Sequence, residues 1–212
     1  NPERGWGMVL PGFFSEDIRI DNHAANGRSS KSFISEGRWE KVISKVKKGD
    51  YVFIQFGHND EKADSTRHTD PGSTFDEILR RYVNETRAKG GIPVLFNSIV
   101  RRNFVQPKDD AIAKDVRRTP GEEEQPKEGV VLFDTHGAYL DAPRNVAKEL
   151  GVTFIDMNKI TFLFQPHRIH GNATFVRAGL SHSCVYIQAA NHQHTHKETY
   201  ISYHHTPHYL IT

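Results

Sequence analysis

The sequence predicts an α/β fold built on a parallel sheet. Short apolar runs without polar–apolar alternation, at residues 51–56, 92–97 and 152–156, fit strands that are buried on both faces. Between the first two runs lies an amphipathic segment that suits the crossover helix of a right-handed βαβ unit. With 212 residues, of which 36% are hydrophobic and 25% charged, the chain has the size and composition of one globular domain.

The N-terminal part of the chain is expected to begin with a loop rather than a long element. Residues 1–14 contain Gly-Trp-Gly and Pro-Gly steps, which indicate a loop around an anchoring Trp6 with about one turn of helix. Residues 17–21 alternate polar and apolar side chains and predict a short strand. A short helix over residues 31–36 should follow, because serine residues that can cap it precede it.

Three further helices are predicted from apolar side chains at helical spacing. Residues 39–46 carry apolar side chains at i, i+3, i+4 and i+7, and residues 75–83 form a second such stripe that ends before Gly90. Residues 139–150 predict a third helix, with Pro143 tolerated within its first turns.

The segments between these elements differ in character. Residues 61–73 are polar and predict a long surface loop, a kind of segment that is often functional in compact domains. Residues 101–128 are charged and proline-containing, so we expect a loop or excursion there. Residues 130–133 fit either a short strand or a buried patch.

Composition excludes several classes of function. The net charge is only +2 with His neutral, a balance that gives no case for binding nucleic acid, which would need basic residues gathered into a patch or stripe. The apolar runs are far shorter than the roughly 20 residues that span a bilayer. A single cysteine, Cys184, cannot form an intrachain disulfide. We expect no cofactor, and the sequence does not determine the oligomeric state.

From residue 161 the composition changes. Residues 161–212 contain nine of the thirteen His residues, a single acidic residue and no clear period, which predicts a poorly ordered or loosely packed tail. An altered reading frame is an alternative explanation for this change in composition. A third hypothesis is a metal site at His192, His194 and His196, because imidazoles that alternate along an extended segment share one face.

Two loops contain groups that can stabilise a negative charge. Gly57, His58, Asn59 and Asp60 follow the strand at 51–56, where open α/β sheets bind their ligands. The Asn59 amide can donate a hydrogen bond there, and Gly27 exposes a main-chain N–H in a second loop. Two such donors form an oxyanion hole, in which losing one costs about 3–4 kcal/mol. Ordinary turn chemistry explains each loop taken singly.

Several motifs in their order along the chain carry a resemblance to a known family. Over about residues 3–160 the sequence resembles SGNH (GDSL-type) hydrolases, most of all the rhamnogalacturonan acetylesterase branch. The matching stretches are Gly5-Trp6-Gly7, Asn26-Gly27-Arg28-Ser29-Ser30, Glu36-Gly37-Arg38-Trp39, Gln55-Phe56-Gly57-His58-Asn59-Asp60, Arg101-Arg102 and Thr135-His136-Gly137-Ala138-Tyr139.

The resemblance implies a flavodoxin-like, three-layer α/β/α sandwich over residues 1–160, followed by the atypical tail at 161–212. It also implies a carbohydrate esterase that removes acetyl groups from pectic polysaccharide by serine acyl transfer. In the family, the glycine and the asparagine that correspond to Gly27 and Asn59 are the oxyanion donors. Acetylated polysaccharide or oligosaccharide is the expected partner, and a secreted or periplasmic location is expected.

Two parts of the family pattern do not map onto the chain. The nucleophilic serine belongs to a Gly-Asp-Ser motif that does not occur here, so we expect the first strand and its serine to be missing. The family's Asp-X-X-His has Gln193 in place of the acid, which leaves the base unidentified and His196 only a candidate. Ser29 and Ser30 are expected to cap a helix rather than replace the nucleophile, and His58 is expected to be structural.

These departures leave the activity of the chain open. One hypothesis is an esterase that is impaired or inactive as it stands. Another is a non-catalytic remnant or a glycan-binding module, and a further one is a His-rich metal-binding protein.

Overall fold

The structure is a computed structural model, and it describes residues 5–101, 104–105, 131–132, 134–163 and 185–188. Its centre is a five-stranded sheet with the order β1-β7-β2-β3-β6. The strands are β1 (Arg19–Asn22), β2 (Tyr51–Gln55), β3 (Ile92–Phe96), β6 (Thr153–Ile155) and β7 (Val185–Gln188). The predicted strands at 17–21, 51–56, 92–97 and 152–156 are therefore confirmed, within a residue or two at their ends.

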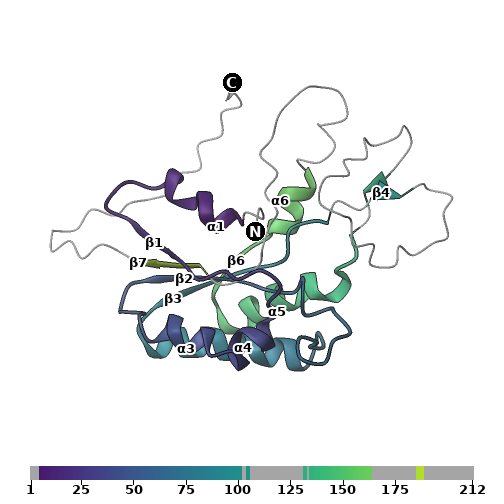
Figure 1. Ribbon diagram of the computed structural model, residues 1–212, viewed down its shortest axis with the longest axis horizontal. Coiled ribbons are helices and arrows are strands. Elements are labelled where there is room, and N and C mark those ends of the chain that lie inside the picture. The colour runs from purple at the N-terminus through teal and green to yellow at the C-terminus, as the bar shows by residue number, and fades with distance from the viewer. Residues whose placement is uncertain (1–4, 102–103, 106–130, 133, 164–184, 189–212) are drawn as a thin grey trace, which may run out of the picture.

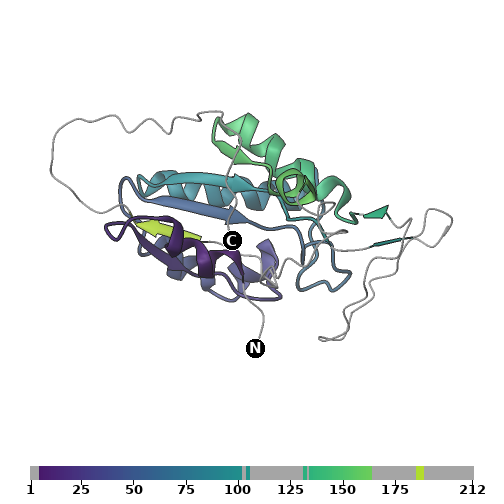
Figure 2. The ribbon, with the colours of Figure 1, turned by 90° about the horizontal axis from the view of Figure 1, so that it is seen from above.

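Four strands of the sheet run in one direction and β7 runs against them. β2, β3 and β6 are mutually parallel. β7 pairs antiparallel with both β1 and β2, so β1 and β2 point the same way. Figure 2 shows the yellow-green arrow of β7 beside the N-terminal elements. The carboxyl ends of β1, β2, β3 and β6 consequently lie at one edge of the sheet, but the sheet is mixed rather than wholly parallel.

Helices cover both faces of the sheet and complete three layers. One face carries the helices that pack against β2 and β3 in the main core, and the other carries α1 and α6 (Figure 1). The helices are α1 (Trp6–Val9), α2 (Ser30–Ser35), α3 (Arg38–Ile43), α4 (Thr74–Ala88), α5 (Asp141–Leu150) and α6 (Met157–Leu163). Two 3₁₀ helices, η1 (Leu10–Phe13) and η2 (Gly137–Leu140), precede β1 and α5. The predicted α/β/α sandwich is confirmed.

The main core forms where the apolar stripes of the helices meet the sheet. Trp39 of α3 packs edge-on against Tyr82 of α4, with ring centroids 4.5 Å apart. Val52 and Ile54 of β2 face the same core and are fully buried. Burying side chains of this size stabilises the fold by about 1.5–3 kcal/mol each. The stripes that predict α3 and α4 are thus the surfaces that these helices bury.

Trp6 anchors the opposite face of the sheet. Its ring lies 5.6 Å from that of Phe96 and 6.5 Å from that of Phe53, and its indole N–H donates to Gln55 Oε1 over 2.8 Å. This confirms the predicted anchoring tryptophan with one helical turn. Burial of β2 on this face is incomplete, because Tyr51 at its start is 43% exposed. The apolar run predicts a strand that is buried on both faces, and this prediction is wrong for Tyr51.

Some element boundaries differ from the sequence-based prediction. Residues 139–140 belong to η2, so α5 begins at Asp141 and Pro143 lies in its first turn, where no intrahelical N–H is lost. Residues 130–133 do contain a strand, β5 (Val131–Leu132). It pairs with β4 (Phe104–Val105), within a segment for which no strand was predicted.

Two elements connect the 161–212 segment with the rest of the chain. α6 crosses residue 160, and β7 lies within the sheet although the composition of this segment indicated no strand. The division of the chain at residue 160 remains a prediction. In the described part of the chain, no helix is long and apolar enough to cross a membrane.

Candidate active site

The loops that follow β1, β2 and β3 meet at the carboxyl edge of the sheet. In an open α/β sheet this edge is where ligands bind. Asp60, in the loop after β2, is the residue that connects two of these loops. Its carboxylate accepts hydrogen bonds from the Ser30 N–H at 3.0 Å, the Gly57 N–H at 3.0 Å and the Thr69 hydroxyl at 2.9 Å, and also from the Ser30 hydroxyl.

Asp60 lies in the turn after β2 and is also an internal anchor. It is completely buried. Burial raises the pKa of its carboxyl above the usual value, although the hydrogen bonds from Ser30, Thr69 and Gly57 act in the opposite direction. An acceptor with this many donors holds the loop after β2 against the start of α2.

Asn59 touches the loop that contains Gly27. Its side-chain amide donates to the main-chain carbonyl of Arg28 over 3.2 Å. An amide NH₂ has two hydrogens, so Asn59 can hold this loop and still donate to a ligand. The structure thus brings together the two loops that carry the predicted oxyanion donors. The catalytic role of Gly27 and Asn59 remains a prediction.

Gly27 and Gly57 have different reasons to be glycine. Gly27 has φ +76°, and a Cβ there would meet no atom within 4 Å, so only its backbone conformation favours glycine. Gly57 has φ +126°, and a Cβ there would lie 2.8 Å from Ser98 Oγ. The loop after β2 therefore leaves the sheet through a position where both conformation and space require glycine.

Neither serine after Gly27 presents its hydroxyl as a nucleophile. Ser29 is fully buried and caps α2, forming a reciprocal capping box with Ser32. This confirms the capping role predicted for Ser29. Ser30 is also fully buried, but it is the first residue of α2, and its hydroxyl donates to Asp60. The cap predicted at Ser30 is therefore wrong, because Asp60 is its partner.

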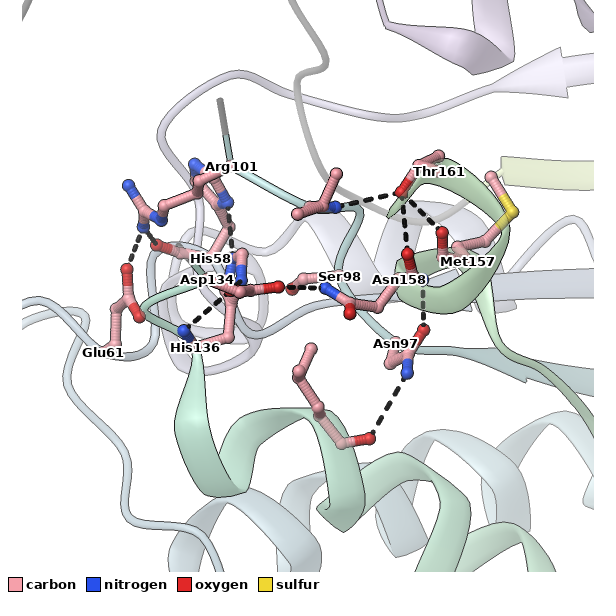
Figure 3. A network of polar contacts seen from close by, with 12 residues as sticks. His58, Glu61, Asn97, Ser98, Arg101, Asp134, His136, Met157, Asn158 and Thr161 are labelled. Carbon is pink, nitrogen blue, oxygen red and sulfur yellow. Dashed lines mark hydrogen bonds and ion pairs between the residues drawn. The ribbon is translucent and has the colours of Figure 1, made fainter. Parts of the chain in front are cut away.

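A carboxylate and two imidazoles form a chain beside the Asn59 loop (Figure 3). Asp134 Oδ1 lies 2.5 Å from His136 Nδ1, and His136 Nε2 lies 2.9 Å from His58 Nδ1. His136 is only 1% exposed. Sequence reasoning did not predict this cluster, because 78 residues separate His58 from His136. In the sequence, only the Thr135-His136-Gly137 motif pointed to a functional role for any residue of this cluster.

Neighbouring polar groups fix both ends of this chain. Asn158 donates to the second oxygen of Asp134. Burial acts to raise the pKa of the Asp134 carboxyl, but hydrogen bonds and charge from His136, with the bond from Asn158, outweigh it and hold the pKa below its usual value. At the other end, Arg101 donates to the His58 carbonyl over 3.0 Å and forms an ion pair with Glu61.

Asn97, which follows β3, connects this cluster to α6. Its side-chain oxygen accepts from the Asn158 N–H at 2.9 Å, and its amide donates to Asp156 at 2.9 Å. Asp156 also accepts from the Lys159 N–H at 3.0 Å, which caps the start of α6. The position of Asn158 beside Asp134 is therefore fixed by main-chain as well as side-chain bonds.

An open hollow of about 410 Å³ lies beside the 61–73 loop. It is lined by Lys31, Ser65, His68, Thr69, Asp70, Thr74, Glu77 and Ile78. Neither Gly27, Asn59 nor His58 contributes to its walls. The hollow therefore lies beside the candidate site, and Thr69, which donates to Asp60, is part of its wall.

Among the described residues, no group of three His, Cys, Asp or Glu side chains is arranged to hold a metal ion. His192, His194 and His196, which carry the metal-site hypothesis, lie outside the described residues. His196 as a candidate base lies outside them for the same reason. Both hypotheses remain predictions.

Comparison with known families identifies the class to which this fold and these loops belong. The sequence matches the profile of the GDSL-like Lipase/Acylhydrolase family over residues 1–178. The chain belongs to this family, and the resemblance to SGNH hydrolases is confirmed.

Individual relatives narrow the branch of the family. The rhamnogalacturonan acetylesterase RhgT of Bacillus subtilis is 37% identical over 156 residues, which cover 74% of this chain and 56% of that protein. A rhamnogalacturonan acetylesterase of Emericella nidulans is 43% identical over 56 residues, 26% of this chain and 22% of that protein.

A second Bacillus subtilis protein, YesY, described as a probable rhamnogalacturonan acetylesterase, is 37% identical over 101 residues, 47% of this chain and 46% of its own. The chain thus spans about half the length of RhgT and YesY. The crystal structure of YxiM from Bacillus subtilis superposes with a TM-score of 0.57 at 22% identity, covering 77% of this chain and 40% of that one. This likeness confirms the fold.

Proposed function

We propose that the chain carries the oxyanion-binding part of a carbohydrate esterase that removes acetyl groups from rhamnogalacturonan-type pectic polysaccharide. The observation that carries the proposal is the hydrogen bond from Asn59 to Arg28, because it brings the Asn59 amide to the loop of Gly27. The names of the relatives RhgT and YesY supply the substrate class. A secreted or periplasmic location is part of the same proposal.

In the proposed reaction a hydroxyl oxygen adds to the carbonyl carbon of the acetyl ester. The carbonyl oxygen becomes an oxyanion, which the Asn59 amide and the Gly27 N–H stabilise. Such donors act mainly on the transition state, since the negative charge develops only there. The C–O bond to the sugar then breaks, and the sugar oxygen takes up the proton that the attacking hydroxyl has lost. The acetyl group stays on the nucleophile until water releases it as acetate.

The nucleophile is the part of the proposal that the chain does not supply. No Gly-Asp-Ser run occurs in its 212 residues, and Ser29 and Ser30 are buried and hydrogen-bonded. We therefore expect the 212-residue chain by itself to be impaired or inactive. For serine proteases, the oxyanion hole and binding alone retain about 10³–10⁴-fold catalysis over water.

These same observations favour a second candidate function, a non-catalytic remnant or glycan-binding module. Two assays separate the candidates. The protein expressed from the full open reading frame should release acetate from acetylated rhamnogalacturonan, and its failure to do so would contradict the esterase proposal. If the 212-residue chain clearly hydrolysed p-nitrophenyl acetate above the buffer rate, the hypothesis of a non-catalytic remnant would be contradicted.

A further inference from the structure

The hollow beside the 61–73 loop has the size of a small-molecule site. Its volume of about 410 Å³ lies within the range of about 300–1,000 Å³ that ligand pockets occupy. The start of α2 contributes Lys31 to its wall, and the start of α4 contributes Thr74, Glu77 and Ile78. Residues of the 61–73 loop complete the wall. The long polar loop predicted from the sequence therefore borders a surface on which a ligand can bind.

Contacts at several points hold this loop in place. Lys31 Nζ donates to the Ser65 carbonyl over 2.8 Å. The Thr69 hydroxyl donates to the buried carboxylate of Asp60 over 2.9 Å, and the Thr69 N–H donates to the Asp60 carbonyl over 3.2 Å. The Tyr139 hydroxyl donates to the carbonyl of Thr69. A ligand would therefore meet a wall that is already formed, which lowers the entropic cost of binding.

The wall offers both acceptors and donors to a ligand that carries hydroxyl groups. Within the residues that the structure describes, the Glu77 carboxylate makes no hydrogen bond or ion pair, so it can accept from a ligand. Hydrogen bonds from a hydroxyl to a carboxylate are charge-assisted and stronger than neutral ones. The Thr74 hydroxyl accepts from the Asp70 N–H over 2.8 Å and can still donate its own hydrogen.

The charges of the wall favour a neutral ligand over an anionic one. The carboxylates of Asp70 and Glu77 outnumber the single ammonium group, that of Lys31, so the wall is negative when its histidine is neutral. A ligand carboxylate would be repelled there. A metal ion is not indicated either, because the described residues contain no three His, Cys, Asp or Glu side chains arranged to hold one. Ile78 gives the wall an apolar part that suits ring carbons or a methyl group.

We propose that this hollow binds a neutral sugar residue of the polysaccharide, away from the ester that is cleaved. The inference rests on the proposed function, which supplies polysaccharide as the ligand. The hollow and the Asn59 loop are held by the same carboxylate, because Ser30 and Thr69 both donate to Asp60. Lys31 directly follows Ser30 in α2. A chain of sugars bound in the hollow is thereby placed beside the loops that carry the oxyanion donors.

Binding of a remote sugar gives the hollow a role in selectivity. Binding energy from parts of a substrate that do not react can be used to orient the reacting group. An acetyl ester on a polysaccharide gains this energy, whereas p-nitrophenyl acetate has no sugar and gains none. The hollow therefore raises kcat/KM for the polysaccharide relative to the small ester.

Amide signals in nitrogen–proton correlation spectra of the full chain test the site without any assay of activity. Oligosaccharides of unacetylated rhamnogalacturonan, which contain neutral rhamnose, should shift the signals of Ser65, Thr69, Thr74 and Glu77. Oligogalacturonate, which consists of uronates only, should bind there about tenfold more weakly or not at all. Absence of shifts at these residues with the first probe, or equal binding of both probes, would overturn the inference.

A matched pair of variants tests the role in turnover. In the protein from the full open reading frame, Glu77→Gln should lower the ratio of kcat/KM for acetylated rhamnogalacturonan to that for p-nitrophenyl acetate by about three- to tenfold. Glu16→Gln, at an exposed carboxylate outside the hollow, should keep the ratio. An unchanged ratio in Glu77→Gln would overturn the role in selectivity. Absence of acetate release by the wild type would instead contradict the proposed function, while the oligosaccharide spectra would still decide whether the hollow binds sugar.

Discussion

The carboxylate of Asp60 accepts two hydrogen bonds from Ser30, one from its main-chain N–H and one from its hydroxyl. Because the same carboxylate also binds Gly57 and Thr69, one buried side chain fixes the start of α2 and the loop after β2. The positions of Gly27 and Asn59 therefore depend on a residue that we do not expect to touch substrate.

Replacing Asp60 should cost more stability than replacing an exposed acid of the same loop. In Asp60→Ala the buried donors of Ser30, Gly57 and Thr69 lose their acceptor, and each such loss costs about 1–3 kcal/mol. We expect unfolding in urea to show a loss of about 3 kcal/mol or more, with little change in Asp70→Asn. A loss below about 1 kcal/mol in Asp60→Ala would contradict the anchoring role.

Two glycine-to-alanine substitutions should differ in cost because only one meets a clash. Gly27→Ala keeps open space around the new Cβ and should cost about 1–2 kcal/mol for its positive φ. Gly57→Ala adds contact with Ser98 Oγ at 2.8 Å, so a loss of about 2–5 kcal/mol is expected. Thermal unfolding of both variants measures the difference. Equal losses would show that the Ser98 contact is relieved without cost.

Local patterns predicted much of the fold. The stripe of α4 and the apolar runs of β2 and β3 are visible because their periods are local. The cap at Ser29 was predictable for the same reason, since a capping box spans only a few residues. The order of the motifs also placed Gly27 and Asn59 on neighbouring loops.

Contacts between distant residues could not be predicted in this way. β7 enters the sheet antiparallel from a segment with no clear period, where composition favoured a loosely packed tail. The bond between His58 and His136 joins residues 78 positions apart, and no periodicity signals such a pair. The turn at Asp60 could be predicted, but its anchoring role could not, because its partner Ser30 is 30 positions away.

The place of β7 inside the sheet predicts a large effect of proline. Ile187 pairs with Ile20 of β1 and Tyr51 of β2, so its backbone lies between two strands. Ile187→Pro removes an N–H from a central strand, and we expect a loss of about 2–4 kcal/mol. Ile187→Val, which keeps the N–H, is the control. Equal thermal unfolding midpoints for the two variants would mean that β7 contributes nothing to stability.

Asp156 should make the fold sensitive to acid. Burial acts to raise the pKa of its carboxyl, but hydrogen bonds from Lys159, Asn97 and Arg144 outweigh it and lower the pKa. A carboxyl with a lowered folded-state pKa stabilises the fold above its unfolded pKa of about 3.9, and this contribution is lost as pH falls through the folded value.

Asp156→Asn should therefore be less stable than wild type at neutral pH and should lose less stability on acidification. Unfolding free energies measured between pH 7 and pH 2 test this. Glu16→Gln, at an exposed carboxylate, serves as the control. If the unfolding free energies of wild type and Asp156→Asn changed with pH in parallel over this whole range, Asp156 would not be the source of the acid sensitivity.

The most direct test of the esterase proposal is deacetylation of acetylated rhamnogalacturonan by an Asn59→Ala variant of the protein from the full open reading frame. Asn84→Ala, the same change at an exposed position of α4, is the matched control. We expect kcat to fall about 100- to 1000-fold in Asn59→Ala, with KM little changed, because the amide binds charge that develops in the transition state. Deacetylation by Asn59→Ala at the wild-type rate would contradict the assignment of Asn59 as an oxyanion donor.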